Sequence, residues 1–163
     1  MAAMTARAGA WARGLGLTLA RVEAAEALAD AGLARALQDG IERGAPVDLP
    51  PFPAEAEWYL VREGGTTMGV AVVRRDCPRR GTAALLAVAI APARRGRATA
   101  TKAILVAERK LAAEGQSPLL ARVPRTNGRG LYFMLRTGFV PLPEDERPDD
   151  SGDATWFGRI RVR

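Results

Sequence analysis

The stretch ALLAVAIAPARRGRATA, residues 84–100, combines a buried strand with the start of a helix. Ala84 to Ile90 is almost purely apolar, which is typical of a central strand covered on both faces. Pro92 ends this strand. The predicted helix spans Ala98 to Ala113, where apolar residues recur at helical spacing, and Gly115 is placed to stop it.

A turn of small and cationic residues, Arg95-Gly96-Arg97-Ala98-Thr99-Ala100, joins this strand to the helix. The first amides of a helix have no partners within it, and the helix dipole is positive there, so an anion is favoured at that end. Arginine side chains add charge that suits phosphates, and small residues keep the backbone approachable. The turn therefore indicates a phosphate site, with a plain solvated turn as the alternative.

The neighbouring segments predict a mixed sheet. A strand at Pro118 to Val123 follows the helix, and such a strand–helix–strand unit requires a parallel, right-handed crossover. Upstream, Trp58 to Glu63 and Thr66 to Arg75 are two strands joined by the turn Gly64-Gly65, which requires antiparallel pairing. The fold class is therefore α/β, a central mixed sheet with helices on both faces.

The rest of the chain completes one domain over residues 15–163, after a flexible N-terminus at residues 1–14. The remaining expected elements are, in chain order, a strand at Leu15–Arg21, one broken helix or two short ones at Glu23–Glu42 with Gly32 interrupting, a loop at Ala45–Pro53, a helix at Asn127–Thr137 capped by Gly138, a short strand from Phe139, a polar loop at Pro141–Asp153 and a last strand at Ala154–Val162.

The amino-acid composition excludes several classes of catalytic and metal site. The 163 residues contain no histidine, which excludes Ser-His-Asp and Cys-His catalysis and histidine-ligated zinc, so we expect no metal. The single cysteine, Cys77, cannot form an internal disulfide and fits a reducing, cytoplasmic location. No apolar run is long enough to cross a bilayer, so no membrane partner is expected. The net charge is +6, and residues 58–143 hold fifteen basic against four acidic side chains.

Two motifs together resemble the signature of the GCN5-related N-acetyltransferase (GNAT) superfamily. The first is Val88-Ala89-Ile90-Ala91-Pro92 followed by the turn at residues 95–100, which resembles an apolar strand, a proline and then R/Q-x-x-G/A-x-G/A opening a helix. The second runs from Asn127 to Phe139, an asparagine, a helix and then Gly-Phe, with the asparagine eleven residues before Gly138. The resemblance covers residues 58–140 well and the N-terminal third only in outline.

The resemblance implies a site for acetyl-CoA as cosubstrate between two splayed parallel strands. The pantetheine arm would pair with the backbone around Val88 and Ile90. The pyrophosphate would meet the amides of Arg95, Gly96, Arg97, Ala98, Thr99 and Ala100. Asn127 would contact the pantetheine arm, and its alternative role as a helix N-cap is compatible with this.

The catalytic groups are less evident. Relatives commonly place a tyrosine, the acid for the departing thiolate, four residues before the glycine of Gly-Phe, and here that residue is Met134. Tyr132 is the candidate acid, but it lies about 200° around the helix from Met134. Glu63 is the candidate base, with Glu57 and Asp76 nearby in sequence, and each has a solvated hairpin charge as its alternative.

We therefore expect an acyl-CoA-dependent N-acyltransferase that acetylates an amine, either a small molecule or an amine on a polymer. Six acids in residues 144–153 could attract a cationic acceptor, with a solvated loop as the alternative. Two other functions stay open: an enzyme of this fold that modifies a nucleic acid base, which the basic body favours, and a non-catalytic module that binds CoA or a partner, which Met134 favours. A homodimer also stays open.

Overall fold

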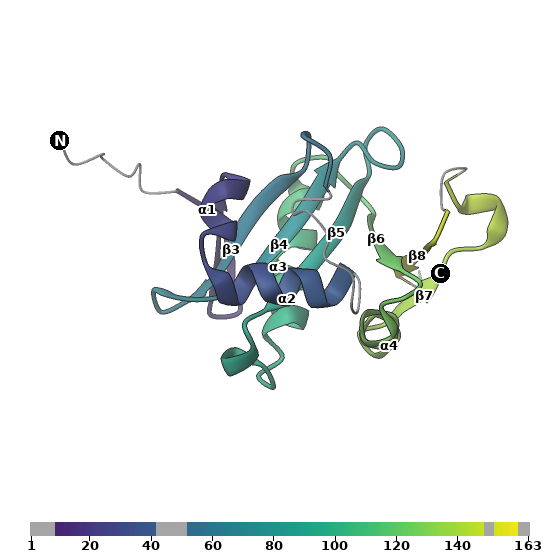
Figure 1. Ribbon diagram of the computed structural model, residues 1–163. Coiled ribbons are helices and arrows are strands. Elements are labelled where there is room, and N and C mark those ends of the chain that lie inside the picture. Colours follow the sequence, from purple (N-terminus) through teal and green to yellow (C-terminus); the bar gives the residue numbers. More distant parts are fainter. Residues whose placement is uncertain (1–8, 42–51, 149–151, 160–163) are drawn as a thin grey trace.

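The computed structural model describes residues 9–41, 52–148 and 152–159 (Figure 1). Its helices and strands are, in chain order, β1 (Ala10–Gly14), β2 (Leu17–Val22), α1 (Ala24–Leu28), α2 (Ala31–Ile41), β3 (Glu57–Glu63), β4 (Thr66–Arg75), β5 (Ala83–Ile90), α3 (Thr99–Ala113), β6 (Leu119–Pro124), α4 (Gly128–Arg136), β7 (Phe139–Pro141) and β8 (Ala154–Arg159). Within these ranges, no helix is long and apolar enough to cross a membrane.

The strands form one eight-stranded sheet in the order β1-β2-β3-β4-β5-β6-β8-β7. All neighbouring pairs in the described sheet are antiparallel except β5 and β6, which are parallel and joined through α3. The predicted mixed sheet and its parallel crossover are therefore confirmed. The last strand, β8, inserts between β6 and β7, so that it lies in the sheet beside the crossover unit.

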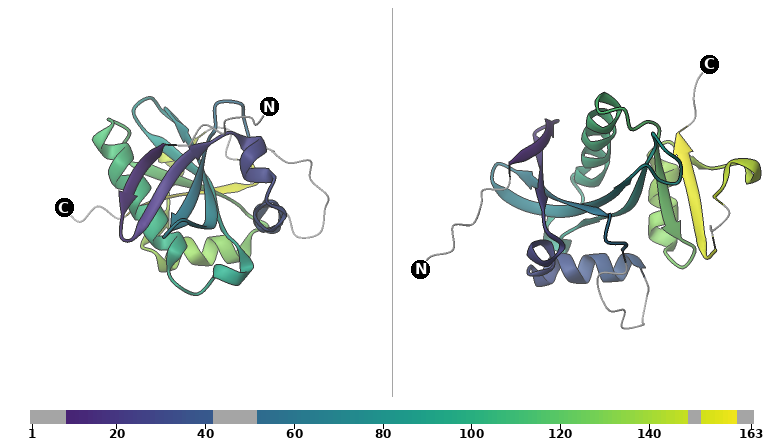
Figure 2. Two further views of the ribbon diagram at one scale, coloured as in Figure 1. Left: turned by 90° about the vertical axis from the view of Figure 1, so that its left-hand side faces the viewer. Right: turned by 90° about the horizontal axis from the view of Figure 1, so that it is seen from above.

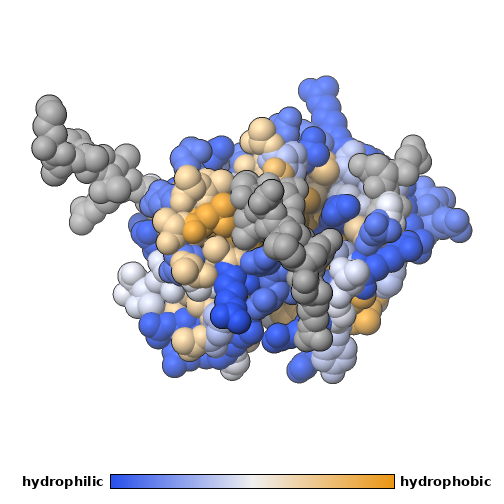
Figure 3. Space-filling model, viewed as in Figure 1, coloured by the Kyte–Doolittle hydropathy of each residue, from blue (hydrophilic) through white to orange (hydrophobic). Residues whose placement is uncertain are grey.

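Helices cover both faces of the sheet, as predicted (Figure 2). Residues alternate between two faces along a strand. On β3, Trp58 and Leu60 pack with Leu33 and Leu37 of α2, whereas Tyr59 and Val61 pack with Ile104 and other residues of α3. Seen from the side of α1 and α2, the surface is mostly hydrophilic, with apolar residues gathered around α1 (Figure 3).

The helix after the turn forms as predicted and begins one residue later, at Thr99. Its stripe of Ile104, Ala107 and Leu111 is buried against the sheet. Gly115 follows the helix with a φ of 79°, a conformation that side-chain-bearing residues rarely adopt. Gly138 follows α4 in the same way, as predicted, with a φ of 87°.

The N-terminal residues differ from the prediction of a flexible segment at 1–14. Ala10–Gly14 form strand β1, which pairs with β2 through a turn at Leu15–Gly16. The predicted strand at 15–21 is β2 and begins later, at Leu17. Strand β1 is held by the Trp11 ring, which stacks on Tyr59 at a centroid distance of 4.3 Å. Residues 1–8 lie outside the described part of the chain.

The alanine-rich segment forms two helices, and the break between them differs from the expected one. It falls at Asp30 and not at Gly32, because the Asp30 carboxylate accepts hydrogen bonds from the amides of Gly32 and Leu33 and so starts α2. Gly32 lies in the first turn of α2. Glu42, most of the loop expected at 45–53 and the end of the last predicted strand lie outside the described residues.

Candidate functional site

A gap opens between the two parallel strands. Strand β5 pairs with β4 along its whole length, but with β6 only from Ala83 to Leu85. A β-bulge at Leu86, where the register against β4 shifts, bends β5 at the point where its pairing with β6 stops. From Val88 to Ile90 the edge of β5 that faces β6 therefore makes no strand pairing with the described part of the chain. Its backbone groups can bind an extended ligand that carries amides.

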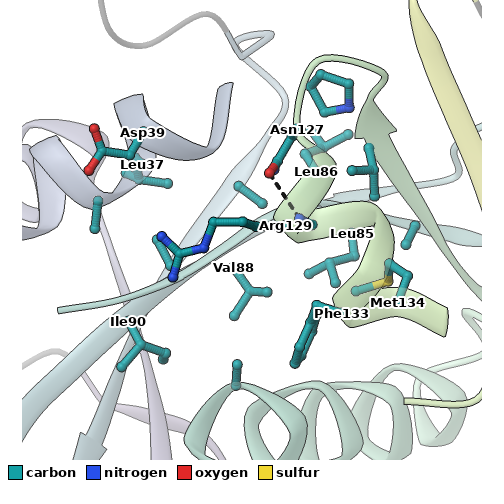
Figure 4. Close-up of a pocket in the computed structure, with 18 of the residues that line it drawn as sticks. Leu37, Asp39, Leu85, Leu86, Val88, Ile90, Asn127, Arg129, Phe133 and Met134 are labelled. Atoms are coloured by element: carbon teal, nitrogen blue, oxygen red, sulfur yellow. Dashed lines mark hydrogen bonds between the residues drawn. The ribbon is translucent and has the colours of Figure 1, made fainter. Parts of the chain in front are cut away.

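A cavity of about 260 Å³, which we call the strand cavity, lies in this gap (Figure 4). Strands β5 and β6 form its sides, α2 and α4 contribute Leu37, Phe133 and Met134, and Ala100 of α3 closes the end next to the turn. The lining on β5 runs from Leu85 to Ile90, so the unpaired part of the strand is exposed to the cavity. Most of this lining is apolar, which fits a linear chain with few polar groups.

The turn before α3 has the geometry of an anion site. Gly96 has a φ of 87°, and Ala98 precedes the helix with a φ of 54° and no side-chain cap. The first amides of α3 are therefore open to a ligand. Thr99 is buried, so a contact from this residue would use its backbone amide.

A second cavity of about 900 Å³, the turn cavity, lies between this turn and α4. It shares Ile90, Arg95, Ala100 and Phe133 with the strand cavity, so the two spaces are continuous. Arg94, Arg95 and Arg136 line the turn cavity and give it a positive lining. The Arg95 Nε donates a hydrogen bond to the Ile90 carbonyl at 3.2 Å, which ties the turn to the end of β5.

The structure thus gathers nearly all of the predicted cofactor residues around two joined cavities. Val88, Ile90 and Asn127 line the strand cavity, and the turn residues line the turn cavity. The exception is Arg97, which is exposed and lines neither cavity.

Asn127 is the N-cap of α4, as the local alternative predicted. Its Oδ1 accepts a hydrogen bond from the amide of Gly130 at 2.9 Å. The packing is close, because a Cβ at Gly130 would lie 2.5 Å from the Asn127 Nδ2. The contact between Asn127 and a pantetheine arm stays a prediction.

Neither candidate catalytic residue lies at the strand cavity. Tyr132 is exposed, lines only the turn cavity and stacks with Arg136, whose guanidinium carbon lies 5.7 Å from the ring centre. Glu63 pairs with Thr66 at the end of the β3–β4 hairpin and lines neither cavity. Their catalytic roles stay untested, but the structure does not bring these two residues together.

The other hairpin acids have structural partners. Glu57 accepts hydrogen bonds from the Tyr59 hydroxyl and from Arg75 Nε, at 2.5 and 3.0 Å. Burial, with the Glu57 carboxylate beside it, raises the pKa of Tyr59 above its ordinary range. The pKa of Asp76 is lowered, first by the hydrogen bond from the Gly81 amide and then by the one from Gln116.

Three charged residues at the strand cavity were missed in the sequence analysis: Asp39 of α2, Arg122 of β6 and Arg129 of α4. Arg122 could have been noticed, because a charged residue between Leu120 and Val123 is unusual in a buried strand. Asp39 and Arg129 gave no such signal. The described residues of the acidic loop, 144–148 and 152–153, line neither cavity.

No protein-family model matches the sequence, and a comparison with curated proteins finds no match. Solved structures do match at the level of the fold. An acetyltransferase from Thermus thermophilus matches with a TM-score of 0.62 and 22% identity, over 89% of this chain and 97% of that one. A probable acetyltransferase of the GNAT family from Chromobacterium violaceum matches with a TM-score of 0.64 and 17% identity, over 97% and 92%.

A Bacillus subtilis acetyltransferase in complex with CoA matches with a TM-score of 0.60 and 13% identity, over 91% of this chain and all of that one. These similarities cover 89 to 97% of this chain, more than the residues 58–140 that the sequence motifs cover. The splayed parallel strands, the open helix N-terminus and these similarities lead to one conclusion: the chain has the fold of the GNAT superfamily.

Proposed function

We propose that this protein is an acyl-CoA-dependent N-acyltransferase that transfers an acetyl group from acetyl-CoA to an amine. The observation that carries the proposal is that the unpaired edge of a strand and the cationic turn lie next to each other. The unpaired edge of β5 at Val88 to Ile90 leads directly into the cavity at the cationic turn before α3. An amide-bearing arm that ends in phosphates matches this sequence of environments. The CoA complex of the Bacillus subtilis neighbour supports the same ligand.

In this proposal the pantetheine arm lies along β5 with its thioester in the strand cavity, and the phosphates lie in the turn cavity. Arg94, Arg95 and Arg136 would offset the phosphate charge there. The free amides at the start of α3 would donate to the pyrophosphate. Backbone amides of β5 would donate to the thioester carbonyl as negative charge develops on its oxygen.

The reaction is a direct attack. The nitrogen of the neutral amine forms a bond to the acyl carbon, and the bond from that carbon to sulfur breaks. The sulfur keeps the electron pair and leaves as a thiolate, while the amine nitrogen loses its extra proton to water. Since Met134 and Phe133 line the strand cavity at α4, neither offers an O–H group to the sulfur, and the thiolate would take its proton from water.

Acetyl-CoA binding tests the donor half of the proposal. Saturating acetyl-CoA should raise the melting temperature, because a ligand at one hundred times its Kd stabilises the folded state by about 2.7 kcal/mol. Arg95→Gln should weaken acetyl-CoA binding about tenfold, since it removes a charged hydrogen-bond donor from the turn. The matched control is Arg109→Gln, an exposed arginine on α3 that lines neither cavity.

Product analysis tests the transfer half. With acetyl-CoA and a panel of primary amines, we expect CoA thiol to appear in step with an acetylated amine detected by mass spectrometry. A rise in melting temperature without any thiol release from the panel would support the non-catalytic CoA-binding module instead. No rise at all would contradict both functions.

A further inference from the structure

The strand cavity contains more charge than a pantetheine arm needs. Apart from Arg95, which also lines the turn cavity, its charged residues are Asp39, Arg122 and Arg129. None of these three side chains makes a hydrogen bond or an ion pair with the rest of the described chain. As far as the described residues are concerned, they are therefore available to a ligand.

Arg122 lies on the face of the sheet that α2 covers. Its neighbours Ala121 and Val123 pack into the core beneath α3, so Arg122 projects to the opposite face together with Leu120. On that face Leu86 packs both with the α2 cluster and with the Leu120 cluster. The cationic turn and the turn cavity lie instead between α3 and α4, so Arg122 is not part of the predicted phosphate site.

Arg129 approaches the same space from another element. Its side chain leaves the first turn of α4 and extends across the cavity toward β5 and α2 (Figure 4). Asp39 lies at the rim of the cavity, in the last turn of α2, and its exposed carboxylate points away from the cavity (Figure 4). The charge that faces the cavity therefore comes from two guanidinium groups, on β6 and α4, with apolar residues beside them.

This distribution selects the charge of the acceptor. Arg122 is half-buried and Arg129 is exposed, and neither guanidinium has a partner in the described part of the chain, so both can bind a carboxylate or a phosphate. An acceptor with only a positive charge would face these two cations.

We infer that the acceptor is an amine that also carries an anionic group, a carboxylate or a phosphate, which Arg122 and Arg129 bind. This inference rests on the proposed N-acyltransferase function. It assigns the side chains around the strand cavity to acceptor selection and leaves donor binding to the turn. It predicts an acceptor with an anionic group, whereas attraction by the acidic loop at 144–153 would require a cationic acceptor.

The test compares acceptors that differ only in the anion. The pairs are L-phenylalanine and 2-phenylethylamine, and O-phosphoethanolamine and ethanolamine, with each rate divided by the fraction of free amine at the assay pH. Within each pair, we expect the kcat/KM of the acceptor with the additional anion to be at least about tenfold higher than that of the other acceptor. This is the effect of one hydrogen bond between charged groups. The amino carboxylate and the amino phosphate distinguish the two sources of the anion.

Two variants connect the preference to the residues. Arg129→Gln should raise the KM for the preferred anionic acceptor about tenfold and leave the KM for acetyl-CoA unchanged. Arg122→Met, which keeps an unbranched apolar stem and removes the charge, should reduce the preference within each pair. Arg125→Gln is the matched control, because Arg125 is an exposed arginine next to the same strand and lines neither cavity.

The outcomes separate this inference from the proposed function. Equal or faster acetylation of the amines without the additional anion would overturn the inference while the N-acyltransferase function stands. A rise in the KM for acetyl-CoA in Arg129→Gln would assign Arg129 to the donor and also overturn it. If acetyl-CoA binds but none of the anionic amines reacts or raises the melting temperature further, the inference is wrong. If acetyl-CoA itself does not bind, the proposed function is wrong, and the inference falls with it.

Discussion

Met134 and Tyr132 lie on opposite sides of α4: Met134 is 3% exposed and lines the strand cavity, whereas Tyr132 is 62% exposed and lines only the turn cavity. The separation of about 200° expected for two residues of a helix is thus realised. Any acid for the sulfur would have to act in the strand cavity, where Tyr132 does not reach.

Tyr132→Phe is therefore expected to change kcat far less than the roughly hundredfold loss that follows removal of a general acid. Tyr132→Ala should instead raise the KM for acetyl-CoA, because the ring forms part of the turn cavity. Steady-state kinetics of the two variants measure both effects. A loss in kcat of a hundredfold or more in Tyr132→Phe would restore the tyrosine as the acid.

Ala98→Gly is expected to stabilise the protein. Ala98 has a φ of 54°, and a residue with a Cβ in this conformation is strained by about 1–2 kcal/mol. Glycine removes that strain at an entropic cost of about 0.4–1 kcal/mol, so the net gain should be a few tenths to about 1 kcal/mol. The change also leaves more room for phosphates, and the KM for acetyl-CoA should fall.

Ala112→Gly is the matched control for this variant. Ala112 is exposed in the last turn of α3, where glycine has a lower helix propensity and should destabilise by up to about 1 kcal/mol. Urea unfolding of both variants gives the comparison. Equal destabilisation by the two glycines would show that the conformation of Ala98 stores no strain.

The sequence was sufficient to predict the centre of the fold. The strand at 84–90, the helix after it and the strand at 118–123 have strong local signals, since an apolar run, Pro92 and Gly115 define their ends. Strand β1 has no such signal. Its five residues include Arg13 and Gly14, and its place depends on the contact between Trp11 and Tyr59, two residues far apart in the chain.

The parts of the site that one continuous segment forms could be predicted from the sequence. The parts that depend on the pairing of strands in the sheet could not. The turn at 95–100 could be identified because a strand, a turn and a helix follow each other directly. Arg122 alone is unusual in a buried strand, but its place at the strand cavity with Asp39 could not be predicted, because the cavity opens only where the pairing of β5 with β6 stops near the bulge at Leu86. A bulge is a property of the pairing between strands and leaves little trace in one segment.

The close packing of Asn127 and Gly130 predicts opposite effects for two glycines in the first turn of α4. Gly130→Ala should destabilise by about 1 kcal/mol or more, because its Cβ would displace the Asn127 side chain and break the N-cap. Gly128→Ala should stabilise by about 0.5–1 kcal/mol, since nothing lies within 4 Å of its Cβ position and alanine favours the helix. Thermal unfolding of both variants measures whether each substitution stabilises or destabilises the protein.

Asn127→Asp keeps an acceptor for the Gly130 amide and should preserve the cap, whereas Asn127→Ala should lose about 1 kcal/mol. If Asn127 has only this structural role, both variants should bind acetyl-CoA like the parent protein. A weaker acetyl-CoA complex in Asn127→Asp, with stability unchanged, would assign the amide group to the pantetheine arm as well.

Acid is expected to weaken the contact between the sheet and the end of α3. Partial burial alone would raise the pKa of Glu114, but hydrogen bonds from Lys110 and Arg75 outweigh it and hold the pKa below its ordinary value of 4.5. Because the folded form binds this proton less readily than the unfolded chain, the ion pairs stabilise the fold fully above about pH 4.5. Their contribution is lost as the pH falls below that value toward the folded pKa.

Glu114→Gln should lower the free energy of unfolding at pH 7 by about 1 kcal/mol, because it removes the carboxylate that joins Arg75 of β4 to Lys110 of α3. The variant should also show a smaller loss of stability than the parent between pH 5 and about pH 3. Glu146→Gln is the control, since Glu146 is exposed and forms no ion pair within the described residues. Urea midpoints of the three proteins, measured across this pH range, test the prediction. If the midpoints of the parent and of Glu114→Gln fall in parallel as the pH decreases, the pH dependence of the fold does not come from this carboxylate.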